Sequence, residues 1–230
     1  MEKTSSAWRI AVAVLAVIAA AFTAYNLGWS NAQAEHQAKA ELSTLLNRSD
    51  IETIELVDGL VYVFGHQSPD SNTVCSAIAY AELLRDLGYD AQPAVLGPVN
   101  AETGYILEKA EVEAPEVLED ASGLNVVLVD HDEYAQSAEG LKDAHIISII
   151  DHHGEGNITT SNQLVYDARP LGSTATIVLI RYYNYGFEPS PQTAKLMLGA
   201  LLSDTSNLQS STTTYPNRSC CRRVMRLPTC

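Results

Sequence analysis

The sequence has little of what several classes of protein require. Only four of its 230 residues are cysteine, which is too few for a small fold held together by disulfides. Thirteen glycines and nine prolines exclude a collagen-like or low-complexity chain. Basic residues are also scarce, 14 Lys and Arg against 28 Asp and Glu, so the net charge is −14. This charge opposes binding to a nucleic-acid backbone, and we expect no nucleic-acid partner.

The residues that are present suffice for a globular core. Hydrophobic residues make up 46% of the chain, and its length suits one domain of ~100–200 residues with additional segments. An acidic protein can still bind a phosphorylated substrate if metal ions lie between its carboxylates and the phosphate. The composition therefore predicts a folded acidic domain in which any phosphate site depends on metal.

The first 34 residues predict export or attachment to a membrane. An uncharged apolar run at residues 10–24 follows two basic residues, as in signal peptides and membrane anchors. Residues 32–34 have an A-x-A pattern, which is typical of a cleavage site. The sequence leaves a cleaved signal peptide and an uncleaved membrane helix open, and both predict an exported protein, periplasmic or anchored outside the cytoplasm. Residues 35–59 are expected to be a polar spacer and the start of the domain.

The last sixteen residues, 215–230, differ in composition from the rest. They hold four arginines, three of the four cysteines and no acidic residue. Residues 1–214, by contrast, carry 10 basic and 28 acidic residues. The cysteines have a C-C-x8-C spacing, unlike that of zinc sites. We therefore expect residues 215–230 to be an aberrant or disordered basic tail.

Residues 60–214 alternate between strand-like and helix-like patterns. Strands are expected at 60–65, 94–97, 124–130, 144–151 and 164–166, and helices at 72–87, 101–110, 173–185 and 191–202. Strands that are apolar on both sides and alternate with helices favour a parallel sheet covered on both faces. The predicted fold is therefore α/β, a Rossmann-like parallel sheet with helices on both faces, preceded by an N-terminal apolar helix.

Acidic and imidazole side chains follow three of the predicted strands, and one acid follows the last predicted helix. These residues are His66 and Asp70, then Asp130, then Asp151, His152 and His153, and finally Asp204. Ligands of open α/β sheets collect at the carboxyl ends of the strands, and carboxylates buried there are costly unless they are paired or bind metal. Oxygen and nitrogen donors without a thiolate suit Mn²⁺, Mg²⁺ or Co²⁺. The sequence thus predicts a divalent-metal site.

Five motifs in this region occur in one order. They are G-H-Q-S-P-D-S-N-T-V-C-S-A-I-A-Y-A at 65–81, L-V-D-H-D-E at 128–133, I-D-H-H-G at 150–154, G-S-T-A-T-I-V at 172–178 and L-L-S-D-T at 201–205. In these motifs the chain resembles the family II, manganese-dependent inorganic pyrophosphatases of the Asp-His-His phosphoesterase superfamily. The resemblance covers residues 60–214. It implies an amino-terminal domain that hydrolyses pyrophosphate with a water molecule held between two metal ions.

The resemblance also implies a role for each residue of the cluster. His66 and Asp70 would bind the first ion, His152 and Asp204 the second, and Asp130 would bridge the two. His153 would contact the substrate phosphate and Asp151 would hold the histidine pair, so these two are the implied catalytic residues. The implied cofactor is a pair of Mn²⁺ ions, with Co²⁺ or Mg²⁺ as alternatives. For the turn at 172–174, a structural and an anion-facing role are both open.

The chain departs from the family pattern in two places. The family's first motif, H-x-x-P-D-x-D, ends in an aspartate that binds the second ion, and here that position is Asn72. An asparagine carbonyl can still act as a metal ligand, but it brings no charge. In the family, a carboxyl-terminal domain with Arg and Lys side chains follows L-S-D-T and grips the pyrophosphate. No such domain follows residue 214 here, so the sequence predicts weak or no turnover by this chain.

Two alternatives to a pyrophosphatase are open from the sequence. One is an exopolyphosphatase or another phosphoesterase of the same superfamily. The other is an inactive, truncated metal-binding domain. The expected partner is pyrophosphate, with the membrane as a second partner if the N-terminal helix is uncleaved, and the sequence leaves the formation of a homodimer open.

Overall fold

The computed structural model of the chain describes residues 23, 25–34, 37 and 58–227. It has two compact units, Met1–Leu46 and Asn47–Cys230. In the first unit, residues 25–34 are helical and exposed, and no helix within the described residues is long and apolar enough to span a membrane. The predicted N-terminal apolar helix falls on residues 10–24, of which only residue 23 is described, so it stays a prediction. Most of the predicted signal or anchor, and nearly all of the spacer, lies outside the described residues, so the exported location stays a prediction.

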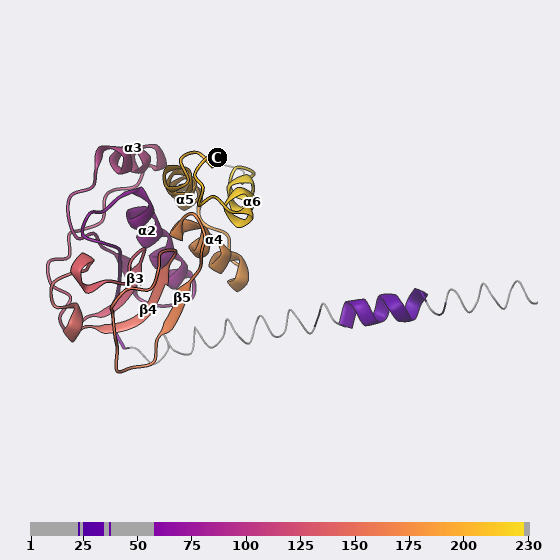
Figure 1. Cartoon of the computed structure of the whole chain (residues 1–230), viewed down its shortest axis with the longest axis horizontal. Coiled ribbons are helices and arrows are strands. Elements are labelled where there is room, and N and C mark those ends of the chain that lie inside the picture. Colours follow the sequence, from indigo (N-terminus) through magenta and orange to yellow (C-terminus); the bar gives the residue numbers. More distant parts are fainter. Residues whose placement is uncertain (1–22, 24, 35–36, 38–57, 228–230) are drawn as a thin grey trace, which may run out of the picture. The chain divides into compact units, whose positions relative to one another are not determined.

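The second unit is built on a parallel sheet of five strands. These are β1 (Val61–Phe64), β2 (Ala91–Pro93), β3 (Asn125–Val129), β4 (His145–Asp151) and β5 (Val165–Ala168), and they lie in the order β2-β1-β3-β4-β5. Figure 1 labels β3, β4 and β5. Phe64 pairs with Leu128, and Val129 pairs with Ile150. This register places the carboxyl ends of β1, β3 and β4 at one edge of the sheet. The parallel sheet predicted from the sequence is confirmed.

One predicted strand is displaced. The second strand was expected at 94–97, but β2 ends at Pro93. Val95 instead forms an isolated bridge with Val117, which lies in the connection that follows α3. Ala94 still donates to the Val63 carbonyl, but Val95 is bonded to Glu116 and Leu118 and no longer to the sheet.

Four helices of the described residues occur close to the predicted positions, and α6 is a fifth in a segment for which no helix was predicted. They are α2 (Ser71–Asp86), α3 (Ala101–Ala110), α4 (Thr174–Tyr185), α5 (Pro191–Asp204) and α6 (Tyr215–Val224), with short 3₁₀ turns η1 (Tyr134–Gln136) and η2 (Leu141–Asp143). Side-chain caps explain where two of them begin. Asp70 accepts a hydrogen bond from the Thr73 N–H at the start of α2, and Ser190 accepts one from the Thr193 N–H at the start of α5. Such caps satisfy backbone donors that have no partner inside the helix.

The two faces of the sheet are covered differently. Val63 and Val127 belong to a core shared with side chains of α2, α4, α5 and α6. Phe64 and Leu128 point to the other face, where residues such as Leu141 from loops and 3₁₀ turns cover them. The predicted helices on both faces are therefore wrong for the described residues. The connections before and after β3, at 111–124 and 130–144, have no apolar run at helical spacing, and each contains a glycine with positive φ, which favours turns.

The basic tail is ordered over most of its length. Residues 215–224 form α6, which begins with a capping box between Thr214 and Asn217. Asn217, Cys220, Cys221 and Val224 are buried, a spacing that places them on one side of a helix. The predicted disorder is therefore wrong for these ten residues, because their composition hid an amphipathic pattern. Both cysteines are free thiols, and burial raises the pKa of Cys220 to about 11.

Candidate metal centre

The predicted ligands meet at the carboxyl edge of the sheet. His66 follows β1, Asp70 caps α2, Asp130 follows β3, His152 and His153 follow β4, and Asp204 ends α5. Ligand atoms of His66, Asp70 and Asp130 lie within 4.8 Å of one another, and so do those of Asp130, His152 and His153. Asp130 is common to both groups. The structure thus brings together residues that are separated by up to 138 positions in the sequence.

Asp130 lies at the centre of this arrangement. Its side chain is 1% exposed, its Oδ2 lies 3.7 Å from His66 Nε2, and its Oδ1 lies 3.3 Å from His152 Nε2. The residue has φ 65°, a left-handed conformation that non-glycine residues adopt rarely and mostly at functional sites. Each oxygen of one carboxylate therefore faces a different histidine, as a carboxylate that bridges two cations must.

Three donors hold the Asp130 carboxylate in place. Oδ2 accepts a hydrogen bond from Thr73 Oγ1 at 2.7 Å. Oδ1 accepts bonds from Asn72 Nδ2 at 2.6 Å and from Thr174 Oγ1 at 3.0 Å. Thr174 belongs to the turn for which two roles were open, and its contact with Asp130 favours the structural one. The sequence motifs did not single out Thr73. The signal that could have identified it is its place in the first turn of a helix that begins close to the end of a strand.

His66 and Asp70 form one side of the cluster. His66 Nε2 lies 3.7 Å from Asp70 Oδ2. Burial raises the pKa of Asp70, but hydrogen bonds from His66 and the Thr73 N–H outweigh it and hold the pKa below its usual value. Burial lowers the pKa of His66, but the hydrogen bond with Asp70 and the charge of Asp130 raise it overall. This is an environment that favours positive charge.

His152 and Asp204 form the other side. His152 Nδ1 donates a hydrogen bond to the Leu171 carbonyl at 2.9 Å, which leaves Nε2 available as a metal ligand. Nε2 lies 3.4 Å from Asp204 Oδ2. Burial lowers the pKa of His152, but the hydrogen bond and charge of Asp130 raise it to about 9. Burial raises the pKa of Asp204 to about 7, and the nearby charge of Asp130 adds to this effect.

Asp204 provides a test of whether the site fits a metal. Its Oδ2 is buried and forms no hydrogen bond within the described residues. A buried carboxylate oxygen without a partner is costly. A divalent cation between this oxygen and His152 Nε2 would remove that cost, and oxygen and imidazole donors suit Mn²⁺. The donor set therefore fits the predicted group.

Asp151 organises the two histidines. Its buried Oδ1 accepts hydrogen bonds from the backbone N–H groups of His152 and His153, at 2.7 and 3.2 Å, and lies 2.9 Å from His153 Nδ1. The hydrogen bond with Asp151 raises the pKa of His153. The His153 side chain is 54% exposed, so its ring lies at the open edge of the site. This is the position that contact with a substrate requires.

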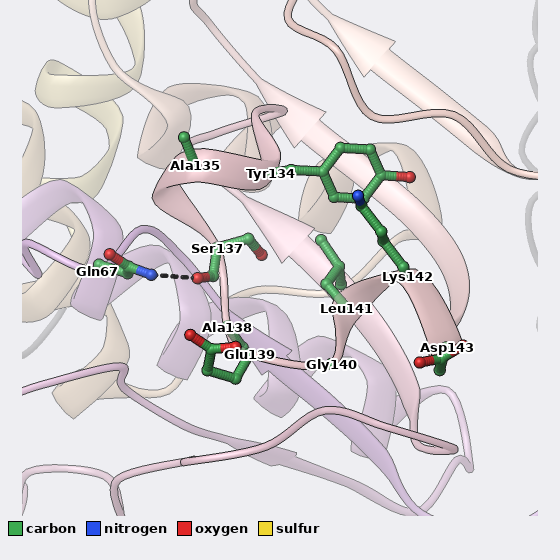
Figure 2. Close-up of a pocket in the computed structure, with 10 residues that line it drawn as sticks. All are labelled: Gln67, Tyr134, Ala135, Ser137, Ala138, Glu139, Gly140, Leu141, Lys142 and Asp143. Carbon is green, nitrogen blue, oxygen red and sulfur yellow. Dashed lines mark hydrogen bonds between the residues drawn. The ribbon is translucent and has the colours of Figure 1, made fainter.

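The site opens into an acidic cleft of about 300 Å³, lined by residues 66, 130–133, 136, 151 and 153–155. A larger hollow of about 530 Å³ is lined by Gln67 and residues 134–143 (Figure 2). None of its lining residues is histidine or cysteine. Figure 2 shows Gln67 Nε2 donating to the Ser137 carbonyl. Of the clustered residues, His66, Asp130 and His153 line the smaller cleft, while the larger hollow adjoins the loop that carries His66.

His131 contacts Ser137, the residue to which Gln67, next to His66, is bonded. It is buried, its Nδ1 lies 3.1 Å from the Val129 carbonyl and its Nε2 lies 3.0 Å from Ser137 Oγ. Burial lowers the pKa of His131. Ser137 in turn accepts the bond from Gln67. Sequence patterns gave no signal for Gln67 or Ser137, because their partners lie about 70 residues apart.

Gly65→Ala is expected to disturb the site through Thr73. A Cβ at Gly65 would lie 2.3 Å from Thr73 Cγ2 and 3.0 Å from the Val129 carbonyl oxygen, so the threonine that holds Asp130 must move. We expect the free energy of unfolding to fall by about 1–3 kcal/mol, measured by urea denaturation. Gly104→Ala is the control, because nothing lies within 4 Å of that position and alanine favours a helix by up to about 1 kcal/mol. Equal effects of the two substitutions would contradict the steric argument.

A His and carboxylate cluster at the carboxyl edge of a parallel sheet is typical of divalent-metal sites in α/β proteins. Residues 60–202 match the model of the DHH family, N-terminal domain. This match covers more than half of the chain, and the chain belongs to that family. The resemblance recognised in the five motifs is thereby confirmed.

Two relatives bear the name of the family that the motifs predicted. The chain is 47% identical over 156 residues to a probable manganese-dependent inorganic pyrophosphatase of an Exiguobacterium species. It is 42% identical over 156 residues to the manganese-dependent inorganic pyrophosphatase of Bacillus subtilis. Both alignments cover 67% of this chain and 50% of the relative. The chain therefore spans about half the length of these relatives.

Solved structures show the same relationship. The crystal structure of a putative family II inorganic pyrophosphatase from Methanococcus jannaschii aligns with a TM-score of 0.68 and 37% identity, covering 73% of this chain and 56% of that one. An exopolyphosphatase-related protein from Bacteroides fragilis has a TM-score of 0.61 at 13% identity, over 78% of this chain and 55% of its own. The second likeness concerns the fold alone.

Proposed function

We propose that the chain hydrolyses inorganic pyrophosphate to two phosphates with the help of bound divalent metal ions. One observation carries this proposal: the two oxygens of Asp130 face two separate sets of ligands, His66 with Asp70 and His152 with Asp204. The names and the identity of the relatives support pyrophosphate as the substrate and manganese as the metal.

The ligand sets divide between two Mn²⁺ ions in this proposal, with Co²⁺ or Mg²⁺ as substitutes. When bound, such ions supply an activated water molecule and neutralise charge on the phosphate. The ions are needed for substrate binding as well, since Asp132, Glu133 and Glu155 line the cleft and repel an anion. Asp130 is the residue on which both ions depend.

His153 is the proposed contact to the substrate. Because Nδ1 donates to Asp151, the ring is fixed, and in the protonated imidazolium, which the raised pKa of His153 favours, Nε2 can donate a hydrogen bond to a phosphate oxygen. Asp151 fixes the backbone of both histidines at the same time. The pair therefore acts as one unit, in which His153 binds and Asp151 orients.

Release of phosphate from pyrophosphate in the presence of Mn²⁺ tests the proposal. We expect slow release that EDTA abolishes and that His153→Ala reduces by ~10²–10³, the typical cost of losing one preorganised electrostatic contact. Metal binding to His153→Ala should persist. Faster release from tripolyphosphate than from pyrophosphate would favour the exopolyphosphatase alternative. Metal binding without any phosphate release would favour a non-catalytic metal-binding domain.

A chimera distinguishes a metal site that cannot catalyse the reaction from one that needs further residues of the relatives to do so. The chain spans about half the length of the relatives, so residues 58–214 are joined to the remaining half of the Bacillus subtilis protein and assayed beside the chain itself. Faster turnover by the chimera would show that the site is competent. Membrane attachment, export and formation of a homodimer stay predictions.

A further inference from the structure

The side chain of Asn72 is buried in a polar junction between three elements. The residue lies in the first turn of α2 and is 2% exposed. Its Oδ1 accepts hydrogen bonds from Ser173 Oγ at 2.7 Å and from the Ala175 N–H at 3.1 Å. Its Nδ2 donates to Asp130 Oδ1 at 2.6 Å. Asn72 therefore joins the start of α4 to the central carboxylate.

Its partners fix the orientation of the Asn72 amide. The backbone N–H of Ala175 can only donate, and a carboxylate oxygen can only accept. Turning the amide over would place N–H against N–H and carbonyl against carboxylate, which removes both bonds. The Asn72 carbonyl oxygen therefore already accepts two hydrogen bonds, and a cation can bind it only after the start of α4 has lost them.

The hydrogen bonds also leave the two oxygens of Asp130 unequal. A carboxylate oxygen offers about two lone-pair positions. Oδ1 accepts from both Asn72 and Thr174, whereas Oδ2 accepts from Thr73 alone. The open position on Oδ2 is on the side of His66, and the occupied oxygen is the one that faces His152. Asp130 can therefore bind one cation through Oδ2 more readily than a second cation through Oδ1.

We propose that Asn72 is a positioning residue and not a metal ligand, and that it makes the two metal sites of this chain unequal. The His66–Asp70–Asp130 site binds a divalent ion first. The His152–Asp204 site binds the second ion more weakly, because Asn72 and Thr174 compete with that ion for Asp130 Oδ1. The inference rests on the proposed function in so far as the cluster must bind divalent ions.

Titration calorimetry of the full chain with Mn²⁺ tests the inference. We expect one tight ion and a second that binds at least ~10-fold more weakly, the usual size of effects from groups around metal ligands. Asn72→Asp removes the competing donor and adds a carboxylate, so the second ion should bind ~10-fold or more tightly than in wild type. Asn100→Asp is the matched control. It adds the same charge at the N-cap of α3, where aspartate caps as well as asparagine, and should change neither affinity.

Asn72→Ala separates the two roles of the residue. If Asn72 were a ligand, this variant would weaken the second ion as His152→Ala does. If Asn72 is a competing donor, the second ion should bind as in wild type or more tightly. Weakening of the second ion in folded Asn72→Ala, or two ions of equal affinity in wild type, would overturn the inference and leave the proposed function standing. No Mn²⁺ binding to wild type would overturn both.

Thermal unfolding provides a readout that does not depend on fitting two affinities. In EDTA, Asn72→Asp should unfold at a lower temperature than wild type, because two carboxylates then face each other at hydrogen-bond distance. Saturating Mn²⁺ should raise the midpoint of Asn72→Asp more than that of wild type, since a ligand that binds only the folded state stabilises it by an amount that grows with the logarithm of its affinity. Equal Mn²⁺-induced shifts in the two proteins would contradict the inference.

Discussion

Asp130→Asn is expected to abolish most of the metal binding and, with it, any phosphate release. Asparagine keeps the size of the side chain and tolerates the positive φ at this position, so the loss of charge is the main change. Because one carboxylate faces both ligand sets, we expect the affinity for Mn²⁺ to fall by at least ~10²-fold, and phosphate release by ~10³-fold or more. Calorimetry and phosphate release measure the two effects.

Asp132→Asn is the matched control for Asp130→Asn. Asp132 is a neighbouring buried carboxylate, but it accepts hydrogen bonds from the Gly156 N–H and from Tyr166 Oη and belongs to neither group of metal-binding atoms. Its replacement should change the affinity for Mn²⁺ only a few-fold. Equal Mn²⁺ stoichiometry and affinity in Asp130→Asn and wild type would contradict the bridging role of Asp130.

Asp167→Asn is expected to be the most destabilising single substitution that we consider. Asp167 lies on β5 and accepts hydrogen bonds from Arg169 Nε at 2.6 Å and from Arg181 Nε at 2.9 Å. Arg181 lies on α4 and is 4% exposed, so the substitution removes a carboxylate that forms an ion pair with a buried cation. Breaking such a buried pair costs about 3–5 kcal/mol, and we expect a loss of about 3 kcal/mol in urea denaturation at pH 7.

The same substitution should reveal a dependence on pH. Burial raises the pKa of Asp167, but hydrogen bonds and charge from Arg169 and Arg181 outweigh it and hold the pKa below its usual 3.8. A lowered folded-state pKa gives stability that is fully present above the unfolded-state pKa and lost as the pH falls through the folded-state value. The difference in free energy of unfolding between wild type and Asp167→Asn should therefore be constant from pH 7 to about pH 5 and shrink below about pH 4.

A control and a contrary outcome define this test. Asp143→Asn replaces an exposed carboxylate on η2 and should change the free energy of unfolding by no more than about 0.5 kcal/mol. If the difference in free energy of unfolding between wild type and Asp167→Asn grew on acidification, Asp167 would stabilise the fold more in its protonated form than as a carboxylate. That result would contradict the ion pair as its source.

The sheet and the cluster were accessible from the sequence for a simple physical reason. Short apolar runs rich in β-branched residues, such as 124–130 and 144–151, favour buried strands, and parallel strands place Asp130 and His152, at or after their ends, at one edge. The order of the five motifs added the roles of those residues. No contact between distant segments had to be known for this part.

The features that were missed depend on such contacts. The orientation of the Asn72 amide is set by Ala175, which lies 103 positions away. The loops that cover the second face contribute single residues such as Leu118 and Leu141, which show no period. In α6 the period was present at positions 217, 220, 221 and 224, but the unusual composition of the segment obscured it.

The loop-covered face of the sheet has a consequence for how the molecule opens. A face held by single apolar side chains in loops opens at a lower free energy than a face packed under helices. Amide hydrogens near η1 and η2 should therefore exchange with solvent through local opening, and those of β1 and β3 only through cooperative unfolding. Gln67 donates hydrogen bonds to the carbonyls of Gln136 and Ser137, so each local opening releases the neighbour of His66. We therefore expect the candidate metal centre to lie at the boundary between a slowly exchanging and a rapidly exchanging part of the protein.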